Sequence, residues 1–136
     1  MKRILGLIAV VLVIASTASA HHSFAAEFDA ARPVKFQGTV IKMEWINPHP
    51  WIHVEVKGAD GSTKVWMIET AAPNSLIRRG FTKNSLPVGS VISIEGFQAR
   101  DGSLRANGRE LAFLDGRKLF LSSAGTGAPD DKGPEK

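Results

Sequence analysis

Residues 34–45, VKFQGTVIKMEW, are the stretch that decides the fold. They are rich in β-branched and apolar side chains, as strands are. The apolar residues alternate in two successive registers, namely Val34, Phe36 and Val40, and then Ile41, Met43 and Trp45. A change of phase close to a glycine, here Gly38, predicts a bulge or a sharp bend. We therefore expect a long, bent first strand that is shared between two sheets.

Downstream of this stretch the pattern remains that of a small β-protein. Further strands are predicted at residues 51–56, 64–69, 91–99, 104–113 and 118–122. Asp60-Gly61 is a hairpin turn, and residues 73–80 predict a short helix. Three strands, a short helix and two or three more strands is the order of an OB-fold. The expected fold class is all-β with a small α contribution: an OB-fold-like antiparallel barrel of five to six strands. A small antiparallel roll of another topology is the alternative.

The first twenty residues have the features of a signal peptide. A basic start, Lys2-Arg3, precedes an apolar run over residues 4–15, and residues 18–20 are the small-x-small sequence Ala-Ser-Ala. The apolar run is too short for a lasting membrane span. We expect cleavage between Ala20 and His21, and a periplasmic or secreted protein with no stable membrane anchor. An uncleaved anchor is the alternative.

The mature chain would hold one small domain in three parts. We expect an N-terminal arm at residues 21–33, the barrel at residues 34–122 and a disordered tail at residues 123–136. Loss of two leader cations takes the formal charge from +4 to +2, with 15 basic and 13 acidic residues. This weak charge and the export signal argue against a nucleic-acid partner. Cysteine is absent, which excludes disulfides, thiolate metal sites and cysteine nucleophiles.

The arm itself predicts a short N-terminal helix. Ser23 is a possible cap, alanines fill the interior, and Pro33 is a stop signal. Phe24 and Phe28 are four residues apart and would share one helix face. We expect that face to dock on the barrel and hold the mature N-terminus in place. A frayed arm with lightly packed phenylalanines is the alternative.

The four histidines fall into two pairs, and the first pair lies at the predicted mature N-terminus: His21 and His22. The new α-amino group of His21 and its Nδ1 atom can chelate one metal ion, because the amine loses its proton easily near neutral pH. An imidazole from His49 or His53 would then complete a three-nitrogen site. A second mode uses the same N-terminal amine with the deprotonated amide and the imidazole of His22, and it leaves the fourth place open to His49 or His53. Nitrogen ligation suits Cu(II) best, with Zn(II) as second choice. An inert, solvated terminus is the other interpretation.

The second pair lies in NPHPWIH, at His49 and His53. Prolines on both sides fix the backbone of His49 in a turn, whereas His53 shares a strand face with Trp51 and Glu55. In an OB-type barrel this turn joins strands one and two and often contributes to the ligand face. With Trp45, the residues Trp51 and Glu55 are therefore ligand-face candidates. Alternatively, His49 serves the turn, His53 bonds to Glu55 or to the backbone, and the tryptophans pack the barrel.

These features predict a small exported binding protein for a metal ion or small ligand, copper before zinc. The alternative is an OB-type module that binds a protein, peptide or small ligand without metal. Nothing indicates an enzyme, since the sequence has no catalytic triad order, phosphate loop or nucleotide fingerprint and no catalytic residue is predicted. Glu27, Asp29, Glu44 and Glu69 are acids without a pairing signal. Copper oxygen chemistry at a histidine-brace-like site stays open.

The chain also resembles a family of small exported bacterial proteins that has no established activity. The resemblance rests on HHSF after a leader, GTV in the first strand, EWINPH, Trp66, residues 77–81, Val88-Gly89 and the Asp115-Gly116-Arg117 turn. It spans nearly the whole mature chain, residues 21–122. Phe81 stands where the pattern has tryptophan, and Ser90 where it has aspartate. The resemblance implies an exported domain of unknown function, and it leaves the histidine motifs intact.

Overall fold

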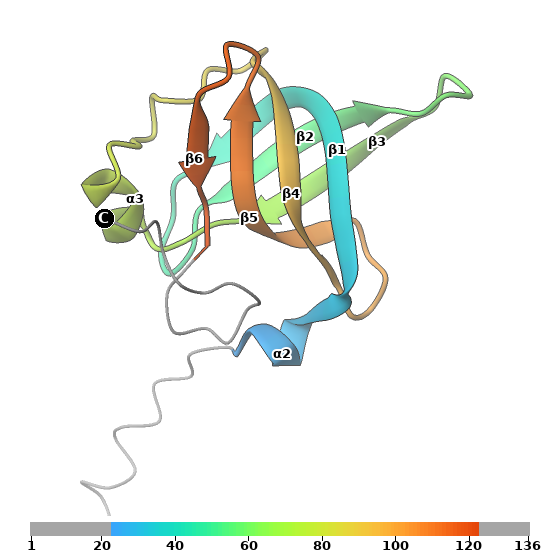
Figure 1. Cartoon of the computed structure of the whole chain (residues 1–136), viewed down its shortest axis with the longest axis horizontal. Coiled ribbons are helices and arrows are strands. Elements are labelled where there is room, and N and C mark those ends of the chain that lie inside the picture. Colours follow the sequence, from blue (N-terminus) through green and yellow to red (C-terminus); the bar gives the residue numbers. More distant parts are fainter. Residues whose placement is uncertain (1–22, 123–136) are drawn as a thin grey trace, which may run out of the picture.

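The long first strand, β1, organises the molecule. The computed structural model describes residues 23–122, and Figure 1 shows its strands curling into a ring. The elements in chain order are α2 (Phe24–Glu27), β1 (Phe28–Glu44), β2 (Trp51–Lys57), β3 (Thr63–Glu69), α3 (Pro73–Arg78), β4 (Val91–Ala99), β5 (Arg105–Phe113) and β6 (Lys118–Phe120). The predicted leader, its cleavage site, His21, His22 and the predicted disordered tail lie outside the described residues. Within residues 23–122, no helix has the length and apolar character needed to cross a membrane.

β1 bends beside Gly38, as its sequence predicts. One half of the strand pairs with β4 up to Thr39, the other half pairs with β2 from Thr39 onward, and the register shifts between Val40 and Lys42. A Cβ atom on Gly38 would lie 2.5 Å from the carbonyl oxygen of Glu55. Glycine is therefore required here, because no other residue allows the two backbones to approach so closely. The bend lets a single strand serve both halves of the ring.

The ring is closed by a parallel contact between β3 and β5. The six-stranded sheet has the order β3-β2-β1-β4-β5-β6, and β3 also pairs with β5 from Met67↔Arg105 to Glu69↔Asn107. The other strand pairs are antiparallel. With α3 between β3 and β4, this arrangement confirms the predicted OB-fold-like, barrel-like architecture. β6 adds a short edge strand beyond β5.

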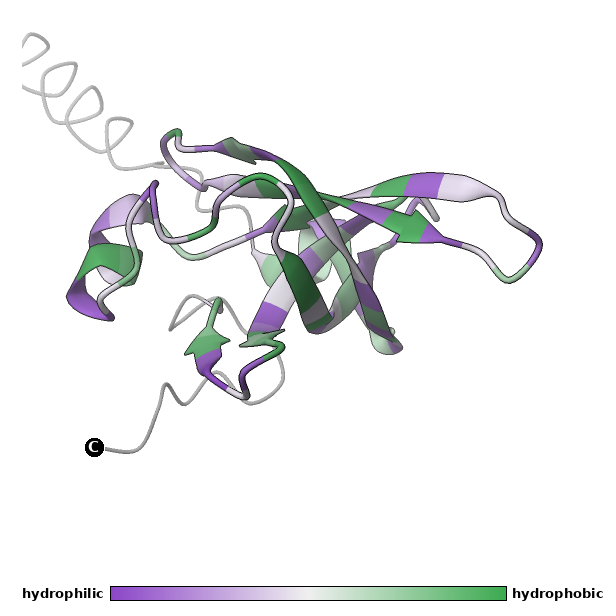
Figure 2. Cartoon of the chain, turned by 90° about the horizontal axis from the view of Figure 1, so that it is seen from above, coloured by the Kyte–Doolittle hydropathy of each residue, from purple (hydrophilic) through white to green (hydrophobic). Residues whose placement is uncertain are grey.

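The interior of the ring is filled by the inward-facing residues of alternating strands. Figure 2 shows the hydrophobic and hydrophilic bands that follow from this alternation. The fully buried large side chains include Val40, Ile52, Val54, Ile68, Ile92, Ile94 and Leu111. Leu76 of α3 and the following Phe81 and Leu86 join the same core. Each such side chain contributes roughly 1.5–3 kcal/mol of transfer free energy, which substitutes for the missing disulfides.

A second, smaller core holds the N-terminal arm. Phe24 and Phe28 pack with Phe97 and Ala99 of β4, and the Phe24 and Phe97 rings meet edge to face at 5.5 Å between centroids. Arg100 adds two hydrogen bonds. Its Nε atom donates to the carbonyl oxygen of Ala25 at 2.7 Å, and its backbone N–H donates to the carbonyl oxygen of Glu27 at 2.9 Å. The described part of the arm therefore docks on the barrel.

The helix in this arm is shorter than the predicted arm, residues 21–33. It ends at Glu27, and β1 begins at Phe28, six residues before the predicted barrel boundary at residue 34. Phe28 pairs with Ala99, and the next pair is Pro33↔Phe97 after a register shift. Pairing with β4 thus overrides the helical propensity of the alanines, because a short helix gains too few hydrogen bonds to persist alone.

Candidate functional site

His49 is held in one orientation by the end of β3. Its Nδ1 lies 2.9 Å from the carbonyl oxygen of Thr70. Because a carbonyl can only accept, Nδ1 carries the proton, and in the neutral ring the lone pair is on Nε2. Thr70 is itself 2% exposed, and its N–H and Oγ1 both donate to the Pro50 carbonyl at 3.0 Å. The imidazole is therefore fixed from behind, with Nε2 as its available donor atom.

Glu69 lies in front of this nitrogen. Its Oε1 is 3.9 Å from Nε2 of His49, and the Glu69 side chain is 13% exposed. Burial raises the pKa of the Glu69 carboxyl to about 7, with repulsion from Glu27 as the next cause and attraction from Arg105 as a partial offset. Sequence reasoning missed this residue, because a single acid at the end of a strand carries no pairing signal. Only the register of the folded sheet, which sets Glu69 opposite Trp51, brings the end of β3 beside the NPHP turn.

The N-terminal arm reaches the same end of the barrel. Trp51, two residues after His49, packs against the small core formed by the arm and β4. Glu27, the last residue of α2, is close enough to influence the Glu69 carboxyl. Figure 1 shows α2 below the ring of strands, at the end where the chain enters the molecule. The first described residues of the arm, the NPHP turn and the end of β3 thus form one region.

His53 belongs to a separate pair on the outer face of the sheet. Its Nε2 is 3.1 Å from Oε2 of Glu44 on β1, and Glu44 also contacts Lys42. The Lys42 and His53 contacts, in that order, lower the pKa of the Glu44 carboxyl. The Nε2 atom is buried, and its approach to Glu44 is not aligned as a hydrogen bond. The acidic neighbour is therefore Glu44 across the ladder and not Glu55, which lies two residues along the same strand.

The described residues alone do not assemble a metal centre. Among residues 23–122, no three histidine or carboxylate side chains are grouped so that they could hold an ion. His49 is paired with Glu69, and His53 with Glu44. A metal site at either histidine would need donors from outside the described part of the chain.

The three tryptophans are half-buried, and each packs against another part of the barrel. The Trp45 ring lies 6.3 Å from Phe81, and the Trp66 ring lies 5.0 Å from Phe36. Trp51 supports the arm. Glu55, the remaining ligand-face candidate, is opposite Thr39 and Val65 in the sheet. The tryptophan rings therefore contribute to both hydrophobic clusters of the described residues.

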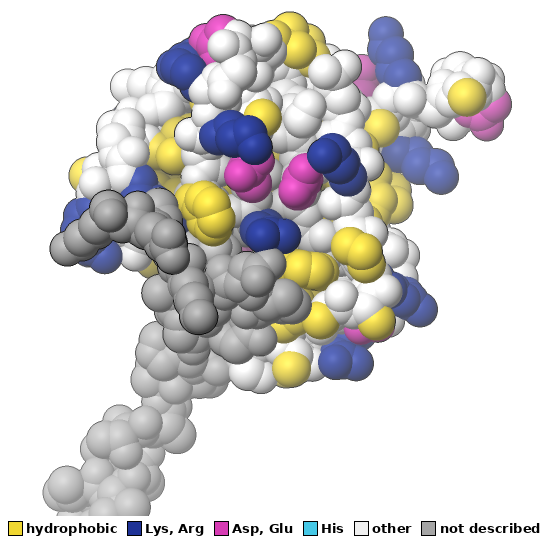
Figure 3. All heavy atoms as spheres, in the orientation of Figure 1, with side chains coloured by type: hydrophobic (Ala, Val, Ile, Leu, Met, Phe, Trp, Pro, Cys, Tyr) yellow, Lys and Arg dark blue, Asp and Glu magenta, His cyan; other side chains and the backbone are white. Residues whose placement is uncertain are grey.

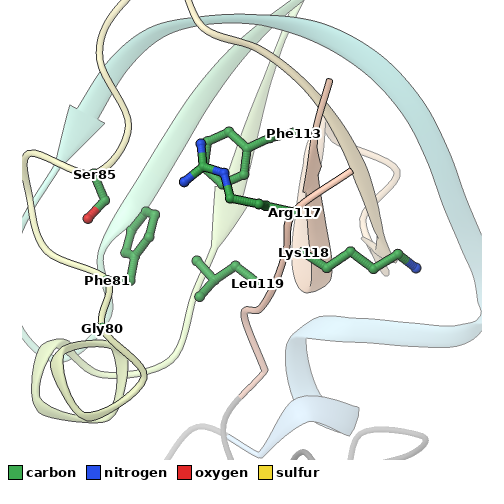
Figure 4. A pocket seen from close by; sticks show the side chains of 7 residues that line it. All are labelled: Gly80, Phe81, Ser85, Phe113, Arg117, Lys118 and Leu119. Atoms are coloured by element: carbon green, nitrogen blue, oxygen red, sulfur yellow. The ribbon is translucent and has the colours of Figure 1, made fainter. Parts of the chain in front are cut away.

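A hollow of about 310 Å³ lies elsewhere, between the segment after α3 and the β5–β6 turn (Figure 4). Phe81, Phe113, Leu119 and Arg117 are among the residues that line it, and the side chain of Lys118 points away from it in Figure 4. The Arg117 guanidinium lies 4.6 Å from the centre of the Phe113 ring and 2.7 Å from Asp115. This hollow contains none of the residues that the sequence predicts as metal ligands or ligand-face candidates.

The surface around β4 to β6 is mixed in charge. Figure 3 shows acidic side chains flanked by basic ones on this face, and two of the ion pairs in the region join Lys35 to Glu95 at 2.6 Å and Lys118 to Glu110 at 2.8 Å. Exposed pairs of this kind contribute little to stability.

Comparison with known proteins adds a family but no activity. No curated protein and no solved structure matches the chain. A family model does match, over residues 9–108, which include the arm, the NPHP turn and Glu69. That match covers most of the sequence, including four of the six strands in full. The chain therefore belongs to a family of unknown function, DUF6152.

Proposed function

We propose that this protein is an exported, periplasmic metal-binding protein, with Cu(II) as the preferred ion and Zn(II) as the second choice. The metal would be held by the amine and imidazole of mature His21 together with Nε2 of His49. The observation that carries the proposal is the orientation of His49, whose Nδ1 is fixed by the Thr70 carbonyl at 2.9 Å. Metal-ligating histidines are typically oriented in this way, with the second ring nitrogen bonded to a carbonyl or carboxylate.

The docked arm supports the proposal that the mature N-terminus supplies metal ligands beside His49. Three peptide units separate His21 from Phe24, so this link can span at most about 11 Å. Phe24 is buried in the core against which Trp51 packs, and Trp51 is two residues from His49. A mature chain that begins at His21 would therefore start within this distance of Phe24, and so near the NPHP turn. Tethering raises the effective concentration of its donors at His49.

The nature of the donors favours copper. An amine and two imidazoles are nitrogen ligands, and a planar arrangement of such ligands suits Cu(II) best among divalent ions. The same donors would also hold Zn(II) in a tetrahedral site. His53 is the less suitable partner, since its Nε2 is buried beside Glu44. The proposal therefore assigns the role to His49.

The test uses the protein exported with its own leader. Intact mass first establishes whether His21 is residue one, and Cu(II) is then titrated while its electron paramagnetic resonance spectrum is recorded. We expect a spectrum typical of nitrogen ligation. The affinity for Cu(II) should fall at least tenfold in His49→Ala and in a form extended by an N-terminal methionine. His53→Ala is the matched control and should bind as the wild type. Cleavage at another site, or unchanged affinity in both His49→Ala and the extended form, would refute the proposal.

The second candidate is a metal-free module that binds a small ligand. The specific observation in its favour is the hollow of about 310 Å³, where the rings of Phe81 and Phe113 lie beside the cationic side chain of Arg117. Ligand pockets commonly combine these two features. Failure of Cu(II) and Zn(II) to bind, combined with saturable quenching of tryptophan fluorescence by a small aromatic anion, would favour this candidate. Trp45 contacts Phe81 and would serve as the reporter.

A further inference from the structure

We infer that Glu69 supplies an oxygen ligand to the metal ion at His49, so that the site has mixed nitrogen and oxygen ligation. This inference rests on the proposed function and extends it by one ligand. It starts from the contact between Oε1 of Glu69 and Nε2 of His49, which are 3.9 Å apart. The two residues are twenty positions apart in the sequence, so the fold and not local spacing brings these atoms together.

The separation fits an ion between the two atoms. Zinc and similar ions bind histidine nitrogen and carboxylate oxygen at about 2.0–2.2 Å. Two donors around one ion are then roughly 3–3.4 Å apart for planar or tetrahedral angles, so Oε1 needs to move by about 0.5–1 Å. A rotation about the side-chain bonds of a glutamate supplies such a shift. The imidazole can stay in place, bonded to the Thr70 carbonyl.

The surroundings of Glu69 favour a cation there. The side chain of Glu69 is largely buried, with 13% of its surface exposed. Among residues 23–122, the basic side chain that lies within ion-pair distance of the Glu69 carboxylate is that of His49. A buried carboxylate is costly unless it is paired or coordinates a metal. Glu44 has no such need, because Lys42 and His53 already contact it.

The added ligand narrows the class of ion. A carboxylate is a hard donor, whereas Cu(I) prefers thiolate and thioether ligands. Two or three nitrogens with one carboxylate oxygen therefore select a divalent ion such as Cu(II) or Zn(II). The site would hold its ion without any sulfur ligand, in keeping with the absence of cysteine.

The experiment compares Glu69→Gln with Glu44→Gln in the protein matured from its own leader, titrated with Cu(II) chloride and, separately, Zn(II) chloride. We expect Glu69→Gln to bind at least tenfold more weakly and Glu44→Gln to bind as the wild type. Glu69→Asp keeps the carboxylate and should recover part of the affinity. In protein labelled with ¹³C-glutamate, metal binding should shift a carboxylate stretching band in the infrared difference spectrum, and Glu69→Gln should abolish that shift.

The outcomes separate this inference from the function on which it rests. Glu69 is not a ligand if Glu69→Gln binds both ions like the wild type and keeps the infrared shift. The proposed function still stands in that case, provided that His49→Ala weakens binding. If the wild type with an authentic N-terminus binds neither ion, both are overturned. Circular dichroism of each variant verifies folding. A metal-free Glu69→Gln protein that melts no lower than the wild type excludes unfolding as the cause of weaker binding.

Discussion

Replacing Glu69 by glutamine should stabilise the metal-free protein above neutral pH. In the folded chain the pKa of this carboxyl is raised from 4.5 to about 7, chiefly by burial. An acid with a raised pKa binds more protons in the folded state than in the unfolded state between these two values. Stability from this group is therefore fully present below pH 4.5 and lost as the pH rises through about 7. Glutamine keeps the shape of the side chain and never ionises.

The magnitude follows from the size of the shift. A change from 4.5 to about 7 corresponds to at most about 3 kcal/mol, since each pKa unit is worth about 1.4 kcal/mol. Rearrangement of the side chain and entry of water reduce this value, so we expect about 1–3 kcal/mol in favour of Glu69→Gln at pH 8. At pH 4.5 the two proteins should have nearly equal free energies of unfolding.

The assay is urea denaturation followed by tryptophan fluorescence, at several pH values and in the presence of a chelator. Glu55→Gln is the control, because Glu55 is an acid at a partly exposed position of the neighbouring strand β2, and its effect should stay within about 0.5 kcal/mol. The reasoning fails if Glu69→Gln is less stable than the wild type at pH 8. It also fails if both proteins lose the same stability between pH 4.5 and pH 8.

Three further changes test the fold that positions the site. Gly38→Ala should destabilise the protein by about 2–3 kcal/mol in denaturation experiments, because the new Cβ atom would lie 2.5 Å from the Glu55 carbonyl oxygen; a neutral effect would contradict the close approach. Phe24→Ala should cost about 3 kcal/mol or release the arm alone, which hydrogen exchange at the Arg100 amide would report; unchanged protection would show that the arm does not depend on this ring. Arg79→Met should increase proteolytic cleavage near Ser122, since Arg79 donates to the carbonyls of Phe120 and Ser122 at 3.1 and 2.9 Å; equal cleavage rates would argue against this role.

Several local features could be predicted because they depend on near neighbours in the chain. The period-two alternation in residues 51–56 and 91–99 identified β2 and β4 almost to the residue. The turn glycines Gly61, Gly102 and Gly116 have positive φ values, as their Asp-Gly sequences indicate. The change of phase near Gly38 likewise predicted the bend in β1.

The partners of the charged side chains could not be predicted in this way. Glu69 meets His49 because the end of β3 lies beside the turn that precedes β2. His53 meets Glu44 because β1 and β2 are paired in one particular register, and a shift by one residue would move Glu44 to the other face. Neither register nor neighbouring strand is encoded by spacing alone.

By itself, the sequence determined the strand and turn pattern, the bend near Gly38 and the presence of four histidines in two pairs, since each depends on residues a few positions apart. Only the tertiary structure decided which acid faces each described histidine, where the helix of the arm gives way to β1, and that the arm and the NPHP turn share one end of the barrel. The physical reason is that the parallel β3–β5 contact closes the ring and so joins segments that are far apart in the chain. The entropy cost of this closure is offset by packing throughout the core and not by any local stretch of sequence.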